Sequence, residues 1–95
     1  MSAHRDPPLV AHVVHALRTG GLENGVVNLI NATPPGRYRH AVVCMTDHDA
    51  FARRIRRDDV PVVDIGKRPG KDPAAYVRLW RVLRRLRPDI VHTRN

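Results

Sequence analysis

The arrangement of apolar segments along these 95 residues restricts the chain to one class of fold. Four short runs rich in β-branched and aliphatic residues alternate with three segments whose apolar residues recur at helical spacing. The four runs are PLVAHVVHAL (8–17), HAVVCM (40–45), VPVVDI (60–65) and DIVHT (89–93). A β-α-β-α-β-α-β order is typical of a parallel sheet with right-handed crossovers. We therefore predict an α/β fold.

Helices are predicted in the three segments between the strands. The first is expected from Leu22 to the prolines of TPPGR (33–37), because its apolar residues share one helical face. A short second helix is predicted within residues 46–59. The third is predicted to begin at Pro73, a residue favoured in the first turn of a helix. Its expected buried stripe is Tyr76, Leu79, Trp80, Leu83 and Leu86.

The expected strand order is the Rossmann-like order 3-2-1-4, with Pro61 favouring an edge position for strand three. In that order the winding reverses between strands one and four, and ligands bind beyond their carboxyl ends. A diglycine turn follows strand one, and polar residues follow strand four. The candidate substrate-binding residues are Gly20, Gly21, Glu23, Asn24, His92, Arg94 and Asn95. For Glu23 and His92, a purely structural role is an equally good interpretation.

The remaining histidines and the single cysteine give no sign of a metal or redox site. Cys44 lies in an apolar run, so we expect a buried, inert thiol and a reducing, cytoplasmic environment. His12 and His15 are expected to pack inside strand one. The other histidines lack the spacing of metal ligands, and we expect no metal and no cofactor. Because no apolar run is long enough, a membrane-spanning helix is not expected.

The positive charge is concentrated in the second half of the chain. The net charge is +8, and basic and acidic residues balance one another over residues 1–50. A solvated basic face is one interpretation, and attraction to an anionic membrane surface is the other. The arginines considered for that surface are Arg53, Arg54, Arg57, Arg78, Arg81 and Arg85. With four aromatic residues and no evident stacking platform, nucleic acid is not the expected partner.

Three segments together resemble a known enzyme family. HVVHALRTGGLENGVVNLIN, YRHAVVCMT and LRRLRPDIVHTRN are similar to the start of family 4 glycosyltransferases of the two-domain GT-B type. The resemblance runs from Leu9 to Asn95 and is nearest to bacterial sugar transferases associated with exopolysaccharide and PEP-CTERM systems. It implies a partial amino-terminal Rossmann-like domain over residues 9–95, truncated at its carboxyl end, after a disordered tail at 1–8.

The resemblance also implies an activity. Family 4 enzymes transfer a sugar from a nucleotide-sugar donor to an acceptor, with retention at the anomeric carbon and usually without a metal. The amino-terminal domain mostly holds the acceptor, here a saccharide or lipid-linked acceptor, so no catalytic residue is assigned and the chain alone is expected to be inactive. Peripheral attachment at the inner membrane face would suit such an enzyme.

Two other functional classes remain open on sequence grounds. One is a dinucleotide-binding domain of an oxidoreductase, with Asp47 after strand two in place of the ribose-binding acid. However, Gly20, Gly21 and Gly25 do not have the G-x-G-x-x-G spacing. The other is a basic module that binds phosphate or nucleic acid.

Overall fold

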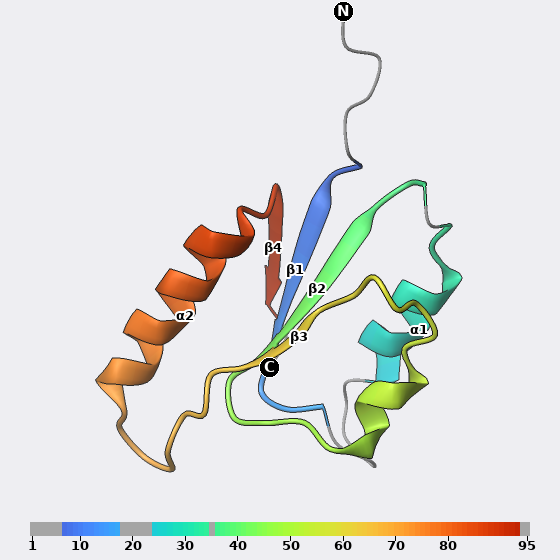
Figure 1. Cartoon of the computed structure of the whole chain (residues 1–95). Coiled ribbons are helices and arrows are strands. Elements are labelled where there is room, and N and C mark those ends of the chain that lie inside the picture. Colours follow the sequence, from blue (N-terminus) through green and yellow to red (C-terminus); the bar gives the residue numbers. More distant parts are fainter. Residues whose placement is uncertain (1–6, 18–23, 35, 94–95) are drawn as a thin grey trace, which may run out of the picture.

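The structure, a computed structural model, describes residues 7–17, 24–34 and 36–93. Its elements alternate between strands and helices in the predicted order (Figure 1). They are β1 (Leu9–Val14), α1 (Asn24–Ala32), β2 (Arg39–Cys44), η1 (Ala50–Arg54, a 3₁₀ helix), β3 (Val62–Asp64), α2 (Pro73–Leu86) and β4 (Ile90–Thr93). The third helix begins at Pro73, as predicted.

The four strands form one parallel sheet in the order β3-β2-β1-β4, which confirms the predicted α/β fold and strand order. In the central strand β1, Val13 lies opposite Val43 of β2 and Thr93 of β4. β3 lies at one edge, directly after Pro61, whose carbonyl accepts a hydrogen bond from the Val42 amide at 2.9 Å. β4 lies at the other edge, and all four of its residues are exposed.

The sheet separates two apolar cores because alternate residues of a strand face opposite sides. On one face Val14 of β1 and Val42 of β2 pack with Val26 and Ile30 of α1. On the other face Val13 and Val43 pack with Ala75 of α2. Cys44 is fully buried in the first core, as expected. Figure 1 shows α1 and η1 on one side of the sheet and α2 on the other.

The predicted buried stripe of α2 is wrong at its two aromatic positions. Tyr76 is 58% exposed and Trp80 is 57% exposed. The helix instead packs on the sheet through Ala75 and the partly buried residues Leu79, Val82, Leu83 and Leu86. Because a helix turns by about 100° per residue, a face centred on these residues leaves Trp80 directed away from the sheet and Tyr76 at the side of the packed face. Hydrophobicity alone could not distinguish the two faces.

Two further predicted elements are shorter in the structure. The helix predicted within residues 46–59 is limited to the 3₁₀ helix η1. Its end is fixed by the Asn31 side chain, which donates to the Arg54 carbonyl and accepts from the Arg56 amide, both at 2.8 Å. Strand one ends at Val14, so His15 lies outside it and is exposed, contrary to the expected packing. His12 is buried, as expected.

Candidate functional site

The carboxyl ends of β1 and β4 open at the same edge of the sheet. β1 pairs with β4 from Val10↔Ile90 to Val13↔Thr93, all in parallel. The helix that follows β1 and the helix that precedes β4 lie on opposite faces, so the winding reverses between these two strands (Figure 1). Ligands of open parallel sheets bind outside such a reversal, because the flanking connections leave a crevice there. The predicted location of the site is therefore present in this fold.

Most of the predicted binding residues lie outside the described part of the chain. These are Gly20, Gly21, Glu23, Arg94 and Asn95. Asn24 is the first residue of α1, and its side chain is likewise outside the described residues. The assignment of these six residues stays a prediction.

His92 lies within β4 and faces the α1 side of the sheet. It is paired with His12 of β1, and their ring centroids are 5.7 Å apart in an edge-to-face arrangement. His92, His12 and His40 line a groove of about 360 Å³ together with apolar residues such as Leu29 and Ile90. Thr93, the next residue, lines a different cavity at the carboxyl edge of the sheet. His92 is therefore on the opposite face of the sheet from that cavity.

A cavity of about 340 Å³, here named the edge cavity, lies at the carboxyl ends of the strands. Residues at or just beyond the ends of the four strands meet there with the first turns of α2. They are Val13, Val14, His15, Met45, Lys67, Tyr76, Leu79 and Thr93. The apolar wall is thus combined with an imidazole, an ammonium, a phenol and a hydroxyl. This combination can hold a ligand that has both hydroxyl groups and an apolar face.

Lys67 is placed at the edge cavity by the loop that follows β3. Its amide donates to the Met45 carbonyl at 2.7 Å, while Gly66 has a positive φ of 74° that turns the chain. The Lys67 Nζ atom donates to the carbonyls of Arg68 at 3.2 Å and Gly70 at 2.8 Å. An ammonium has three donors, so two bonds within the loop leave one for a ligand.

The same loop is fixed to α2 by Arg78 and Asp72. The Arg78 Nε atom donates to the Ile65 carbonyl at 2.9 Å, and its Nη2 atom lies 3.4 Å from Asp72 Oδ2. Asp72 also accepts a hydrogen bond from the Arg68 amide at 3.0 Å. That bond is the main cause that lowers the pKa of Asp72, with the charge of Arg78 acting in the same direction. These contacts hold the lysine loop beside the edge cavity.

The sequence did not single out Lys67, Tyr76, His15 or Thr93 as binding residues. Three of them could have been found from their positions, because His15 follows β1, Lys67 follows β3 and Thr93 ends β4. Tyr76 could not, because its hydrophobic character suggested a place in the core.

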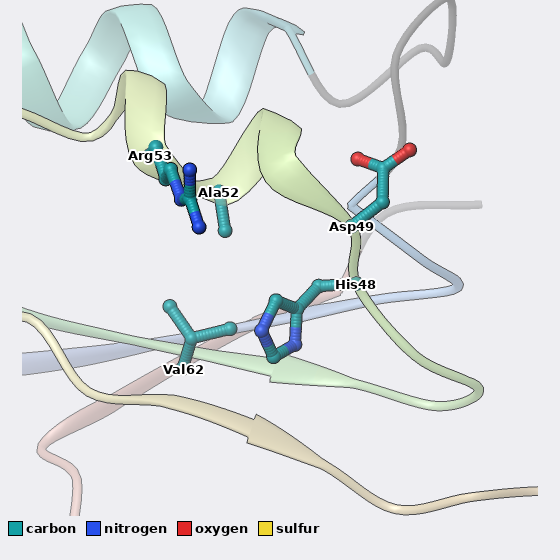
Figure 2. Close-up of a pocket in the computed structure, with 5 residues that line it drawn as sticks. All are labelled: His48, Asp49, Ala52, Arg53 and Val62. Carbon is teal, nitrogen blue, oxygen red and sulfur yellow. The ribbon is translucent and has the colours of Figure 1, made fainter.

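A second cavity, also of about 340 Å³, lies between η1 and β3 on the α1 side of the sheet (Figure 2). The Nδ1 atom of His48 lies 2.8 Å from Asp64 Oδ1. In Figure 2 the His48 ring and the Arg53 side chain approach the cavity from opposite sides, while the Asp49 carboxylate is turned away. This cavity lies at β2 and β3 rather than at the reversal. We therefore assign the candidate site to the edge cavity.

The described residues provide neither a metal centre nor a helix that could span a membrane. Among residues 7–17, 24–34 and 36–93, no group of three or more His, Cys, Asp or Glu side chains could hold a metal ion. In the same residues, no helix has the length and apolar character needed to cross a bilayer. Arg57 donates to both carboxylate oxygens of Asp59 and to the Tyr38 carbonyl, so its guanidinium is used within the fold.

Comparison with known proteins gives one match. The family model described as Glycosyltransferase Family 4 matches residues 19–95. The edge-cavity residues from Met45 to Thr93 lie within the matched segment, whereas Val13, Val14 and His15 precede it. No curated protein and no solved structure matches the chain.

Proposed function

The chain belongs to glycosyltransferase family 4, and we propose that it forms the acceptor-side wall of a sugar-transfer cleft. In this proposal a sugar passes from a nucleotide-sugar donor to a saccharide or lipid-linked acceptor, with retention at the anomeric carbon and without a metal. The product belongs to a cell-surface glycan such as an exopolysaccharide, as in the PEP-CTERM-associated subgroup. The groups that perform the chemical step belong to the donor side of the cleft, so these 95 residues alone do not transfer sugar.

The observation that carries the proposal is the composition of the edge cavity at the reversal of the sheet. Sugars combine hydroxyl groups with apolar ring faces, and they are bound by matching donors and acceptors beside an apolar or aromatic surface. Lys67, Tyr76 and Thr93 supply the polar groups, while Val13 and Leu79 supply the apolar wall. The remaining donor of Lys67 suits a sugar oxygen, and its charge also suits a carboxylate or phosphate on the acceptor.

The family assignment favours this function over the dinucleotide-binding alternative. A nicotinamide dinucleotide requires the glycine spacing that this chain lacks. Reduced nicotinamide is nevertheless a useful negative probe, since the oxidoreductase alternative requires it to bind.

Calorimetric titration of the 95-residue chain with a panel of neutral and acidic oligosaccharides tests the proposal. We expect at least one acceptor to bind, and Thr93→Val and Lys67→Ala to weaken its binding by about tenfold each, the loss of one or two hydrogen bonds. Arg68→Ala is the matched control, because it removes a positive charge from the same loop without changing the lining of the edge cavity. Circular dichroism verifies that all three variants are folded.

Three outcomes would contradict the proposal. The first is that no saccharide or nucleotide sugar binds, and the second is that reduced nicotinamide binds instead. The third is that Arg68→Ala weakens saccharide binding as much as Lys67→Ala, since charge alone and not the edge cavity would then be responsible.

A further inference from the structure

The cavity between η1 and β3, here named the η1 cavity, contains a histidine that is oriented by a carboxylate (Figure 2). The Nδ1 atom of His48 lies 2.8 Å from Asp64 Oδ1, and because an ionised carboxylate only accepts hydrogen bonds, this nitrogen is the donor. The bond leaves Nε2, on the other side of the ring, as the atom that can contact a ligand. Asp64 therefore fixes the orientation of the imidazole.

The backbone that carries this pair is held by neighbouring segments. On the two sides of His48, the Leu17 amide donates to the Asp47 carbonyl at 3.2 Å, and the Asp49 amide donates to the Leu17 carbonyl at 2.9 Å. Asp64 is the last residue of β3, which is paired with β2. The imidazole and its carboxylate are thus attached to an extension of the sheet, which keeps them in place before any ligand binds.

Arg53 approaches the η1 cavity from the side opposite His48 (Figure 2). It is exposed, and no described residue forms a hydrogen bond or an ion pair with its guanidinium. This distinguishes it from Arg57 and Arg78, whose guanidinium groups are bonded within the fold. The Arg53 guanidinium therefore retains its full set of donors for a ligand.

The space between these two groups has small apolar walls. The η1 cavity has a volume of about 340 Å³, and Ala52 and Val62 form its sides. Asp49 also lines the cavity, but Figure 2 shows its carboxylate turned away. The polar atoms that the lining directs into this space are thus nitrogen atoms, which suit an anionic group. The volume exceeds that of a single phosphate ion, so part of a small organic molecule can also be held.

A phosphate ester matches these groups better than a carboxylate does. One guanidinium satisfies both oxygens of a carboxylate, whereas a phosphate has a third oxygen for a group on the opposite side. A phosphate monoester and an imidazole both titrate near neutral pH, so they can share one proton between Nε2 and a phosphate oxygen. A carboxylic acid loses its proton at about pH 4 and has none to share at neutral pH.

We propose that the η1 cavity binds the phosphate group of a small phosphate monoester. Arg53 donates to two phosphate oxygens, Nε2 of His48 bonds to the third, and Asp64 acts as a positioning residue for the imidazole. The organic part of the ligand lies against Ala52 and Val62. This site goes beyond the proposed sugar transfer and does not depend on it, because the η1 cavity and the edge cavity have no lining residue in common.

Titration followed by two-dimensional ¹H–¹⁵N spectra tests the proposal, with glycerol 3-phosphate and inorganic phosphate as probes. At constant ionic strength, glycerol 3-phosphate should shift the amides of His48 and Arg53 and bind at least as tightly as inorganic phosphate, while sodium chloride gives no such shifts. His48→Ala and Arg53→Ala should each weaken binding by at least about tenfold. Both residues are exposed, so we expect the variants to fold, which circular dichroism verifies.

Arg56→Ala is the matched control, because it removes the same charge close to Arg53 in the sequence. Arg56 lines a different cavity beside Asn28 and Asn31, which Arg53 also borders. The comparison therefore decides which of the two cavities the phosphate occupies. We expect Arg56→Ala to weaken the binding of glycerol 3-phosphate by at most about twofold.

Several results would overturn the proposal. One is that glycerol 3-phosphate does not bind, whether or not inorganic phosphate does. Another is an equal loss of affinity in Arg53→Ala and Arg56→Ala, or unchanged affinity in His48→Ala. The last is a set of shifts centred on His15 and Lys67, since the phosphate would then lie in the edge cavity.

Discussion

The Nε2 atom of His12 lies 2.9 Å from the Nδ1 atom of His40, and the two rings stack with centroids 5.2 Å apart. Both side chains are buried, with exposures of 1% and 3%. One of the two facing nitrogens must donate and the other must accept, so the hydrogen bond between the rings requires at least one neutral imidazole. Burial is the main cause that lowers the pKa of His40, and the charge of Arg57 adds to it, while Asp59 opposes.

The stability of the fold should therefore decrease in mild acid. The pKa of His40 is below 6.5 in the folded state, so the unfolded chain binds more protons as the pH falls through that value. The contribution of His40 to the free energy of unfolding is fully present above pH 6.5 and is lost as the pH falls towards the lower pKa that His40 has in the folded state. We expect a lower Tm at about pH 5 than at about pH 7.5, measured by circular dichroism.

The variant His40→Gln isolates this effect, because it retains a hydrogen-bonding side chain that does not titrate. Its Tm should vary less over the same pH range than that of the original chain. Asp59 and Asp72 do not interfere, since their pKa values are lowered from 3.8 and they stay ionised throughout. An identical pH dependence for His40→Gln would contradict the role of the buried histidine pair.

The contact between α2 and the sheet should tolerate no larger side chain at Ala75. This residue is fully buried against Val13 and Val43, while its neighbour Ala74 is exposed. Ala75→Leu should lower the free energy of unfolding by about 1–3 kcal/mol, because added atoms must displace packed neighbours. Ala74→Leu should change it by about 0.5 kcal/mol or less. Urea unfolding compares the two, and equal effects would place the packing face of α2 elsewhere.

Gly66 should resist substitution for reasons of backbone conformation alone. A Cβ atom would meet no neighbour within 4 Å at Gly66 or at Gly36, but only Gly66 has a positive φ, of 74°. Gly66→Ala should therefore lower the free energy of unfolding, measured with urea, by about 1–2 kcal/mol. Gly36→Ala should leave the free energy of unfolding unchanged or raise it by up to about 1 kcal/mol, because alanine reduces the conformational freedom of the unfolded chain. A neutral Gly66→Ala would show that the turn before Lys67 is not held in this conformation.

Edge strand β4 should open more readily than β2. All four residues of β4 are exposed and it pairs only with β1, whereas β2 is paired on both sides and five of its six residues are buried. Native-state hydrogen exchange should accordingly show weaker protection for Val91 and Thr93 than for Val42 and Cys44. Equal protection would mean that the edge is covered in solution, for example by a second copy of the chain.

The topology could be predicted from the sequence because its signals are local and agree with one another. Four apolar runs indicated the alternation of strands and helices, Pro61 an edge position for β3 and Pro73 the start of α2. The order 3-2-1-4 was taken from the Rossmann-like class that this alternation indicates. The faces of α2 could not be predicted, since Tyr76 and Trp80 are as apolar as the residues that are buried. Nor could the length of η1, which depends on the side chain of Asn31 from a distant segment.

The topological position of the candidate site follows from the predicted strand order, but the residues that line the edge cavity were not predicted from it. The reversal between β1 and β4 follows from topology, and the edge cavity lies there. Lys67 reaches the edge cavity through a loop held by Arg78 and Asp72, and Tyr76 reaches it from the first turn of α2. Periodicity does not reveal this long-range arrangement.

The central claim, that the edge cavity is the acceptor-side wall of a glycosyltransferase cleft, is tested most directly by mapping where saccharides bind. Two-dimensional ¹H–¹⁵N spectra of the chain are recorded during titration with the oligosaccharide that binds most tightly. We expect shifts to concentrate at the amides of His15, Lys67 and Thr93, at the carboxyl ends of the strands. Shifts confined to the groove around His12 and His40, on the opposite face of the sheet, would contradict it.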